Sequence, residues 1–244
     1  MLRAPTAMRI IAVIPTYNEA ENLPLLVTAL LALPLDINIQ VVDDDSPDGT
    51  GAVADGLALA HPGRVEVLHR VGRRGLRSAY LEGFELALAK RPDAIAQMDA
   101  DLSHDPTRLP DMARALADSD LVLGSRYIAG GSVDHRWPIW RKGLSAWGNF
   151  YARSVLGLRM RDMTTGYRLW RREGLGKMPL GEIRSNGYIF LVEMVFLAHR
   201  LGLRITEVPI HFNDRRLGQS KMSLGIQLEA ALRLWQVRLA HRRP

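Results

Sequence analysis

The sequence predicts an α/β fold in which a mostly parallel sheet carries helices on both faces. Short β-branched runs alternate with stretches of helical periodicity between residues 9 and 126. The hydrophobic content of 47% in 244 residues is enough for a sizeable core and argues against disorder. Aspartates follow two of the apolar runs, as expected where the carboxyl ends of parallel strands border a ligand crevice.

The first half of the chain is expected to form the sheet. Five strands are predicted in chain order, at residues 9–15, 37–44, 64–70, 94–99 and 120–126. Helices are predicted to start at Glu19, Asp48, Leu76 and Pro106. Because crossovers between parallel strands are right-handed, the carboxyl ends of these strands should meet along one edge of the sheet.

The second half is less regular and more basic. Between Arg126 and Arg172 there are ten Arg or Lys residues and two acids. A helix at 188–201, a strand at 203–212, a basic loop at 213–223 and a last helix from about Leu224 are predicted. No repeat or linker divides the chain, so residues 1–244 are expected to be one domain.

Composition restricts the classes of partner. Thirty-two Lys and Arg against 26 Asp and Glu give a net charge of +6, which favours an anionic partner such as nucleic acid, a phosphorylated substrate or lipid headgroups. The absence of cysteine excludes disulfides and thiolate sites. No secretory signal is recognisable at the start, and residues 22–35, the longest uncharged stretch, are too short to span a bilayer. A protein that stays inside the cell is expected.

The first carboxylate cluster is QMDADLSHDP, at residues 97–106. Asp99 and Asp101 are two residues apart at the end of a strand, so both side chains can share one face. Such a pair suits Mg²⁺ or Mn²⁺, completed by water and substrate phosphates. The alternative is a helix start with Ser103 or Asp105 as N-cap, which accounts for Asp105 and leaves the pair unexplained.

Two more strand ends carry candidate nucleotide contacts. In VVDDDSPDGT, at residues 41–50, one of the three consecutive aspartates can accept hydrogen bonds from a base or sugar, while Ser46 or Asp48 caps a helix. In IPTYNEAEN, at residues 14–22, there is no glycine, which disfavours a dinucleotide-binding turn. Pro15 and Tyr17 can form a flat platform for a base, and Glu19 either binds ribose or starts the helix.

Seven ordered motifs together resemble the family 2 glycosyltransferases: VIPTYNEAEN, VVDDDSPDGT, GLRSAYLEGF, MDADLSH, LGSRYIAGG, DMTTGYRLWRR and DRRLGQSKMS. The resemblance covers roughly residues 10 to 223. It implies a GT-A fold with a nucleotide-sugar-binding half at 1–126 and an acceptor-binding half at 127–244. It also implies inverting transfer of mannose from GDP-mannose to a polyprenyl (dolichyl-type) phosphate, with Mg²⁺ or Mn²⁺ as cofactor.

Site residues follow from the resemblance position by position. It implies nucleotide-sugar contacts at Pro15, Tyr17, Glu19, Asp44, Asp99, Ala100 and Asp101. It implies metal ligation by Asp99, Asp101 and Ser103. The sequence departs from the family pattern at three positions: Ser103 where many relatives have Gln, Arg77 where Gly is usual, and Asp45 where Asn or Gly is common.

An acceptor phosphate sets the chemistry expected of the second half. A phosphate monoester has a second pKa of about 6 and needs no strong general base, although His104 stays open as one. It needs cations that bind and orient it. The candidates are Arg126, Arg141, Arg168, Arg215 and Lys221, and the residues expected to be catalytic are Asp101, Arg126 and Arg215. The buried Glu193, and Asp162, are expected to pair with these arginines.

The last helix is predicted to be amphipathic, with an apolar stripe of Leu224, Leu228, Leu232, Trp235 and Leu239. This stripe either packs on the core or lies on a bilayer, where a polyprenyl acceptor has to be met. Peripheral attachment to the cytoplasmic face of a membrane is expected, with a membrane-anchoring partner protein as an open alternative.

Two other functions compete with mannosyl transfer. A related transferase using UDP-glucose or another nucleotide sugar fits the same motifs. A basic nucleic-acid-binding protein fits only the charge, because the chain has no basic stripe with interleaved aromatics, no helix-turn-helix pattern and no zinc pattern. No nucleic acid is therefore expected as a partner.

Overall fold

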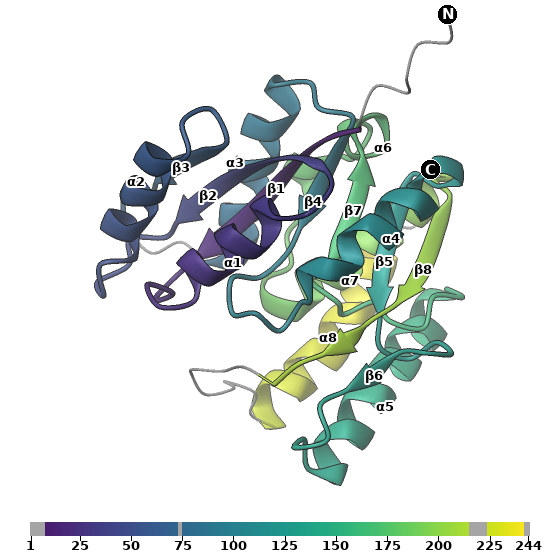
Figure 1. Cartoon of the computed structure of the whole chain (residues 1–244). Helices are drawn as coiled ribbons and strands as arrows, with labels where there is room; N and C mark the ends of the chain where they lie inside the picture. Colours follow the sequence, from purple (N-terminus) through teal and green to yellow (C-terminus); the bar gives the residue numbers. More distant parts are fainter. Residues whose placement is uncertain (1–7, 73–74, 215–223, 242–244) are drawn as a thin grey trace, which may run out of the picture.

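In the computed structural model, one seven-stranded sheet is covered by helices on both faces (Figure 1). The structure describes residues 8–72, 75–214 and 224–241, with side chains from residue 232 onward in the last range. The sheet order is β3-β2-β1-β4-β7-β5-β8. Its strands are β1 (Arg9–Thr16), β2 (Asp36–Asp43), β3 (Val65–His69), β4 (Ala94–Gln97), β5 (Leu121–Ser125), β7 (Arg168–Arg171) and β8 (Ile205–Pro209). The short strands β6 (Ser132–Val133) and β9 (His211–Phe212) form a second, two-stranded sheet.

The helices form two layers. They are α1 (Leu23–Leu31), α2 (Thr50–Ala60), α3 (Leu76–Ala89), α4 (Leu109–Ala115), α5 (Ile139–Leu156), α6 (Arg172–Gly176), α7 (Gly187–Arg200) and α8 (Leu224–Ala240). Short 3-10 turns are η1 (Pro106–Arg108), η2 (Leu116–Asp118) and η3 (Leu180–Glu182). Buried side chains of α1, α2 and α4 share one core with the sheet, and those of α3, α5, α7 and α8 share the other.

All five strands predicted in the first half are present, and the sheet is mostly parallel. β1 pairs in parallel with β2 and β4, and β5 pairs in parallel with β8. The sequence did not predict β7, which runs antiparallel between β4 and β5, nor the long helix α5. The strand predicted at 203–212 is divided between the two sheets after Pro209, a residue with no N–H to donate to a ladder.

Helix starts differ from the prediction by a few residues. α1 begins at Leu23 instead of Glu19, because a hydrogen-bonded turn comes first, in which the N–H groups of Asn22 and Leu23 donate to the Glu19 carbonyl. Pro106 starts a 3-10 turn that Asp105 caps through the Thr107 N–H, as one of the predicted alternatives has it. The helices predicted at 188–201 and from Leu224 are α7 and α8.

The carboxyl ends of β1, β2 and β4 share one edge of the sheet, and the backbone there is unusual. Asn18, Asp45 and Leu102 follow these three ends with φ of 62°, 60° and 60°. A left-handed backbone is rare for residues other than glycine, and such positions concentrate at functional sites. The left-handed backbone at Asp45 is one that glycine and asparagine adopt more readily than other residues.

Within the part of the chain that the structure describes, no helix combines the length and the apolar content that a bilayer crossing requires.

Candidate active site

The aspartate pair follows β4 and is held from two sides. The Tyr80 hydroxyl donates to Asp99 Oδ1 at 3.0 Å, and the Asp99 N–H donates to His104 Nδ1 at 3.2 Å. Asp101 Oδ1 accepts the N–H of Ser103 at 3.0 Å. The two carboxylates are therefore fixed by their neighbours before any ligand binds.

Tyr80 is a site residue that sequence reasoning missed. It lies in α3, is completely buried, and packs its ring against Phe84 and Phe190. Burial and the neighbouring Asp99 raise the pKa of Tyr80 well above 10, so its hydroxyl keeps its proton and donates. An aromatic residue at helical spacing predicts only core packing, and nothing in the local pattern marks its hydroxyl as a contact of Asp99.

Replacing Tyr80 with Phe should preserve the fold and weaken the aspartate pair. The ring stays packed while Asp99 loses its hydroxyl donor, and loss of such a supporting contact costs about 10- to 100-fold in metal affinity or activity. The measurement is metal-dependent turnover against Mn²⁺ concentration. Tyr167→Phe is the matched control, because the Tyr167 hydroxyl is also in a buried residue but donates to the Asp105 carbonyl. Equal effects of both variants would refute the role of Tyr80.

The donor atoms at this edge fit a hard divalent cation. Asp99 and Asp101 supply carboxylate oxygens, and the buried Oγ of Ser103 has no hydrogen-bond partner among the residues that the structure describes. Among the described residues no three His, Cys, Asp or Glu side chains gather as a metal site. Two carboxylates and a hydroxyl, completed by water and phosphates, match the preference of Mg²⁺ or Mn²⁺.

The predicted nucleotide contacts lie beside this edge. Pro15 is in β1, paired with Val42, and Tyr17 follows this strand. Glu19 accepts a hydrogen bond from Asn22 Nδ2 at 2.8 Å, and Ala100 is buried between the two aspartates.

Asp44 follows β2 and is 4% exposed. Its carboxylate accepts hydrogen bonds from the guanidinium of the buried Arg70 and from the Gly75 N–H. Arg70 also contacts Glu82, at 3.2 Å. The sequence did not single out Arg70, a buried cation that helps to hold Asp44 in place. Arg77, at the unusual position, joins α3 to the segment before α7 by donating to the Ile183 carbonyl at 2.9 Å.

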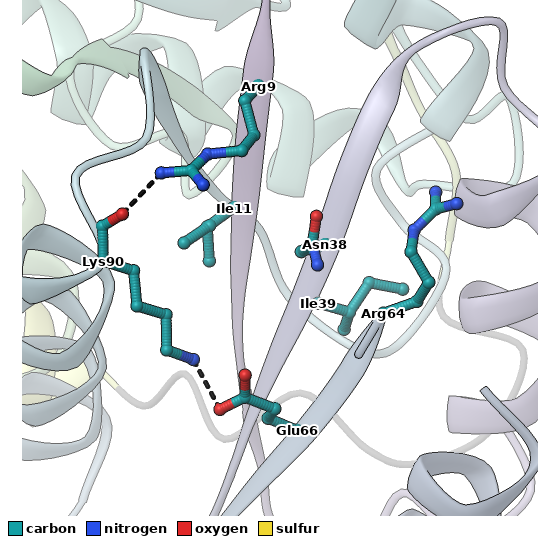
Figure 2. Close-up of a pocket in the computed structure, with 7 residues that line it drawn as sticks. All are labelled: Arg9, Ile11, Asn38, Ile39, Arg64, Glu66 and Lys90. Atoms are coloured by element: carbon teal, nitrogen blue, oxygen red, sulfur yellow. Dashed lines mark hydrogen bonds and ion pairs between the residues drawn. The ribbon is translucent and has the colours of Figure 1, made fainter. Parts of the chain in front are cut away.

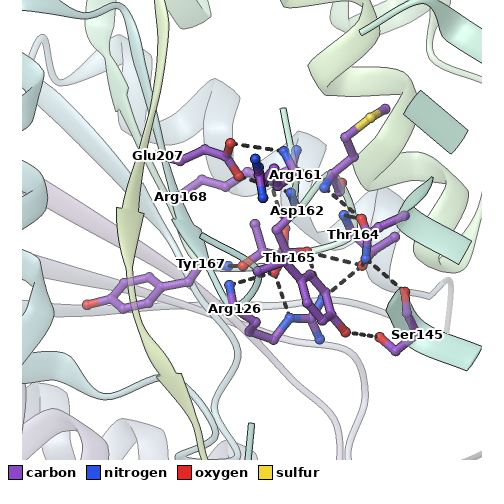
Figure 3. A network of polar contacts seen from close by, with 12 residues as sticks. Arg126, Ser145, Arg161, Asp162, Thr164, Thr165, Tyr167, Arg168 and Glu207 are labelled. Atoms are coloured by element: carbon purple, nitrogen blue, oxygen red, sulfur yellow. Dashed lines mark hydrogen bonds and ion pairs between the residues drawn. The ribbon is translucent and has the colours of Figure 1, made fainter. Parts of the chain in front are cut away.

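The second half of the site is built on a buried ion pair (Figure 3). Arg126 donates from Nε to Asp162 Oδ2 and from Nη2 to Asp162 Oδ1, both at 2.7 Å. Nη2 also donates to Thr164 Oγ1 at 2.8 Å. Burial alone would lower the pKa of Arg126, but the Asp162 carboxylate raises it above its usual value. Asp162 thus pairs with one of the predicted arginines.

Arg141 lies beside this pair on an aromatic platform. Its guanidinium carbon is 3.8 Å from the centre of the Trp137 ring, and it contacts Asp214 at 3.3 Å. Trp137 packs edge-on against Phe212, whose ring is 5.2 Å from the Arg126 guanidinium carbon. The structure therefore brings Arg126 and Arg141 to one aromatic cluster.

His104 joins the two halves of the site. Its ring stacks on Tyr167 at 5.1 Å and meets Phe212 edge-on at 5.6 Å, while its Nδ1 accepts from Asp99. Burial lowers the pKa of His104. The aspartate pair and Arg126 are thus connected through one imidazole and one phenyl ring.

Arg168 does not lie where an acceptor phosphate could reach it. It is completely buried in β7, and its Nε and Nη2 donate to the carbonyls of Thr165, Met163 and Leu191 at 2.8–3.0 Å. Burial lowers the pKa of Arg168 to about 9. The predicted acceptor contact is corrected: this cation organises the loop that carries Asp162.

Glu193 is buried, as predicted, but the expected arginine partner is wrong. Its carboxylate accepts from the Ser185 N–H at 2.9 Å and contacts His241 Nε2 at 2.8 Å. Burial alone would raise the pKa of Glu193, but these hydrogen bonds hold it below its usual value. Glu193 therefore ties α7 to the end of α8. Arg215 and Lys221 lie outside the described residues.

Where the structure describes its side chains, the apolar stripe predicted for the last helix is exposed and does not pack on the core. Leu232, Trp235 and Leu239 are 70%, 47% and 56% exposed, whereas Leu234 and Val237 are buried. The interpretation as a core-packed stripe is wrong for these three residues. The side chains of Leu224 and Leu228 lie outside the described part.

A separate hollow of about 210 Å³ opens at the opposite, amino-terminal edge of the sheet (Figure 2). Its cations are already engaged: Arg9 donates to the Lys90 carbonyl, Lys90 contacts Glu66 at 2.5 Å, and Arg64 donates to the Ile37 carbonyl. These contacts join strands and helix ends, so we assign the charged residues of this hollow a structural role.

The fold class is shared with enzymes that bind nucleotide sugars. Glucosyl-3-phosphoglycerate synthase from Mycobacterium tuberculosis, in complex with Mn²⁺, UDP and glucosyl-3-phosphoglycerate, matches with a TM-score of 0.66 and 17% identity over 96% of this chain and 79% of that chain. A mannosyltransferase from Pyrobaculum calidifontis, in complex with GDP-Man and Mn²⁺, matches with a TM-score of 0.65 and 17% identity over 98% of this chain and 66% of that chain. These similarities confirm the GT-A type fold.

Sequence comparison gives the family. Residues 11–178 match Glycosyl transferase family 2. The polyprenol monophosphomannose synthase of Mycolicibacterium smegmatis is 46% identical over 94% of this chain and 88% of its own length. The undecaprenyl-phosphate mannosyltransferase of Micrococcus luteus is 46% identical over 96% of both chains. The chain belongs to the family 2 glycosyltransferases, as the motifs predicted.

Proposed function

We propose that this glycosyltransferase moves mannose from GDP-mannose to the phosphate of a polyprenyl phosphate, with inversion at the anomeric carbon. The observation that carries the proposal is a continuous series of contacts between the two halves of the site. Asp99, in the aspartate pair suited to a metal and a diphosphate, contacts His104. The His104 ring meets Phe212, whose ring lies beside the Arg126 guanidinium. The names of the two 46% identical relatives support both the sugar and the class of acceptor.

Each half of the site has its own task. Residues 1–126 bind the nucleotide sugar, with Pro15, Tyr17, Glu19, Asp44 and Ala100 contacting the nucleotide side. Asp99, Asp101 and Ser103 hold Mg²⁺ or Mn²⁺, which when bound neutralises charge on the departing diphosphate. Residues 127–244, together with Arg126, bind the acceptor.

The acceptor phosphate is the nucleophile, and the arginines bind and orient it. Arg126 and Arg141 lie at one aromatic cluster, and Arg215 and Lys221 are assigned with them from the family motif. A phosphate oxygen is anionic near neutral pH, so orientation replaces proton removal as the main task of the protein. The burial of His104 and its hydrogen bond to the Asp99 N–H fit a supporting role instead of that of a base.

Donor choice is tested by supplying labelled GDP-mannose and UDP-glucose in parallel. Polyprenyl phosphate in detergent is the acceptor, with Mg²⁺, Mn²⁺ or EDTA. We expect labelled lipid from GDP-mannose alone and none with EDTA. Product from UDP-glucose alone would keep the reaction class and refute the mannose assignment, whereas product that persists in EDTA would refute the metal assignment.

We also propose that α5 and α8 form a membrane face that meets the cytoplasmic surface of the bilayer. It consists of the exposed apolar residues Ile139, Trp140, Trp147, Phe150, Leu232, Trp235 and Leu239. In Figure 1 the two helices lie next to each other, and they are joined at Tyr151, which stacks on Trp147 at 5.3 Å and accepts from Trp235 Nε1 at 3.1 Å.

The chemistry of this face matches a bilayer with anionic headgroups. Arg153 lies over the Phe150 ring at 5.2 Å and Arg238 over the Trp235 ring at 5.8 Å. Aromatic and apolar side chains beside arginines suit the boundary between headgroups and acyl chains. Such a face would bring the acceptor site to its lipid substrate, with or without an anchoring partner protein.

Replacing Trp140 with Ser should weaken binding to vesicles of mixed neutral and anionic lipid by about tenfold. The free energy gained when a large exposed apolar side chain is buried corresponds to about that factor in affinity. Co-sedimentation measures the bound fraction. Leu59→Ser on α2 is the control, since Leu59 is 83% exposed outside the membrane face. Equal binding by wild type and Trp140→Ser would contradict the assignment of this face.

A further inference from the structure

Asn149 is a buried amide in the middle of α5, and three of its four hydrogen bonds go to Met163 and Thr164, directly after Asp162. It is 2% exposed. Its Oδ1 accepts the N–H groups of Met163 and Thr164 at 2.8 and 3.3 Å. Its Nδ2 donates to Thr164 Oγ1 at 3.0 Å and to the Ser145 carbonyl at 3.1 Å. Four hydrogen bonds satisfy the whole capacity of the side chain.

The Thr164 hydroxyl connects Asn149 to Arg126 through hydrogen bonds. The hydroxyl of Thr164 accepts from Asn149 and from Arg126 Nη2, so its own proton is left to point at Asp162 Oδ1, 3.4 Å away (Figure 3). A hydroxyl has one donor and two acceptor positions, and all three are used here. Rotation of this hydroxyl is therefore fixed by its three neighbours together.

The arrangement leaves the Nη1 edge of the Arg126 guanidinium for a ligand, because the rings of Tyr127 and Phe212 each lie 5.2 Å from its carbon. Nε and Nη2 are committed to Asp162 and Thr164. Within the described residues Nη1 donates no hydrogen bond to the protein, and the side chain keeps 7% exposure. The direction in which Nη1 points depends on how Asp162 and Thr164 hold the other two nitrogens.

We propose that Asn149 is a positioning residue that sets the orientation of Arg126 toward the acceptor phosphate. The inference rests on the proposed function, in which Arg126 contacts that phosphate. The Asn149 amide uses its four hydrogen-bonding positions within the protein, so we assign it no contact with a ligand. It fixes the backbone of residues 163–164 and the Thr164 hydroxyl. This hydroxyl and the Asp162 carboxylate then hold the Arg126 guanidinium in its orientation.

The test separates acceptor from donor. Asn149→Ala should raise KM for polyprenyl phosphate about tenfold or more, because small misplacements of an orienting group are costly, and should leave KM for GDP-mannose within about twofold. Val155→Ala is the control: Val155 is a buried apolar residue of the same helix, so this variant should lower stability while every hydrogen bond of Asn149 to residues 163–164 stays in place. Equal shifts of both KM values, or no shift, would overturn the proposal.

Asn149→Asp covers the case in which the alanine variant does not fold. The carboxylate can still accept both backbone N–H groups but cannot donate to Thr164, so a raised acceptor KM is still expected, and an unchanged one overturns the positioning role. In an Arg126→Lys background, adding Asn149→Ala should raise acceptor KM no further, because residues that act through one another are not additive. Full additivity would overturn the inference.

Direct binding of farnesyl phosphate distinguishes a failure of the positioning role from a failure of the proposed function. If the wild type binds farnesyl phosphate and the Asn149 variants bind it with equal affinity, only the positioning role is refuted. Wild type that neither binds farnesyl phosphate nor turns over polyprenyl phosphate would refute the proposed function and the positioning role with it.

Discussion

Asp101→Ala is expected to lower sugar transfer by on the order of a thousandfold or more, while the protein stays folded. Asp101 contributes a carboxylate to the pair at the end of β4, and the leaving diphosphate depends on the charge that this pair holds in place. Asp101 follows the end of β4 and accepts the N–H of Ser103, two residues further on, so the strand itself does not include the substituted position. Turnover with saturating Mn²⁺ measures the effect, and circular dichroism confirms the fold.

Asp105→Ala is the matched control for this variant. Asp105 lies in the same acidic segment, but it caps η1 through Thr107, at 2.9 Å. Losing this cap should cost about 1 kcal/mol of stability and little activity. Transfer by Asp101→Ala at the rate of Asp105→Ala would mean that the aspartate pair is wrongly assigned.

Arg126→Ala is expected to abolish transfer to the lipid and also to destabilise the fold. Asp162 is completely buried, and without its partner it becomes an uncompensated charge, which costs about 3–5 kcal/mol. Denaturant unfolding measures the stability change, and transfer to polyprenyl phosphate measures the functional one. Arg204→Ala is the control, because its contact with Asp120 is exposed and such pairs are worth about 0–1 kcal/mol.

A double variant separates the two effects. Arg126→Met with Asp162→Asn removes both charges and leaves an amide oxygen that can accept the backbone N–H of residue 126. Stability should then return to near the wild-type value, since neutralising both members of a buried pair avoids the isolated charge. Transfer should stay lost. Recovery of transfer together with stability would show that Arg126 has only a structural role.

The parallel part of the fold was predictable because its signals are local. β1 to β5 are short β-branched runs ended by turn residues, and the helices between them repeat with helical period. The site edge was also predictable, since aspartates that follow apolar strands have to meet at the carboxyl end of a parallel sheet.

The missed elements depend on long-range pairing. β7 is a four-residue strand held antiparallel between β4 and β5, and nothing in Arg168–Arg171 distinguishes it from a loop. α5 carries exposed Trp and Phe on its outer face and a buried Asn inside, which inverts the usual amphipathic pattern. Both patterns make sense only once the tertiary structure and a membrane surface are considered.

Partner choice among charged residues was equally hard to predict. Arg126, Arg141 and Arg168 occur in one basic segment, yet of these three only Arg168 is completely buried. Glu193 has His241 as its partner, 48 residues away in the chain. Helical and strand periodicity show which face a residue occupies but not which distant side chain meets it there.

The anomeric configuration of the product tests the central claim most directly. Mannose labelled at its anomeric carbon is supplied as GDP-α-mannose with polyprenyl phosphate and Mn²⁺, and the lipid product is examined by NMR. Direct attack by a phosphate held at Arg126, on a sugar held at the Asp99 and Asp101 edge, predicts a single β-mannosyl phosphate. An α-linked product would contradict single displacement between the two halves of the site, and mannose joined anywhere other than the lipid phosphate would contradict the assigned acceptor.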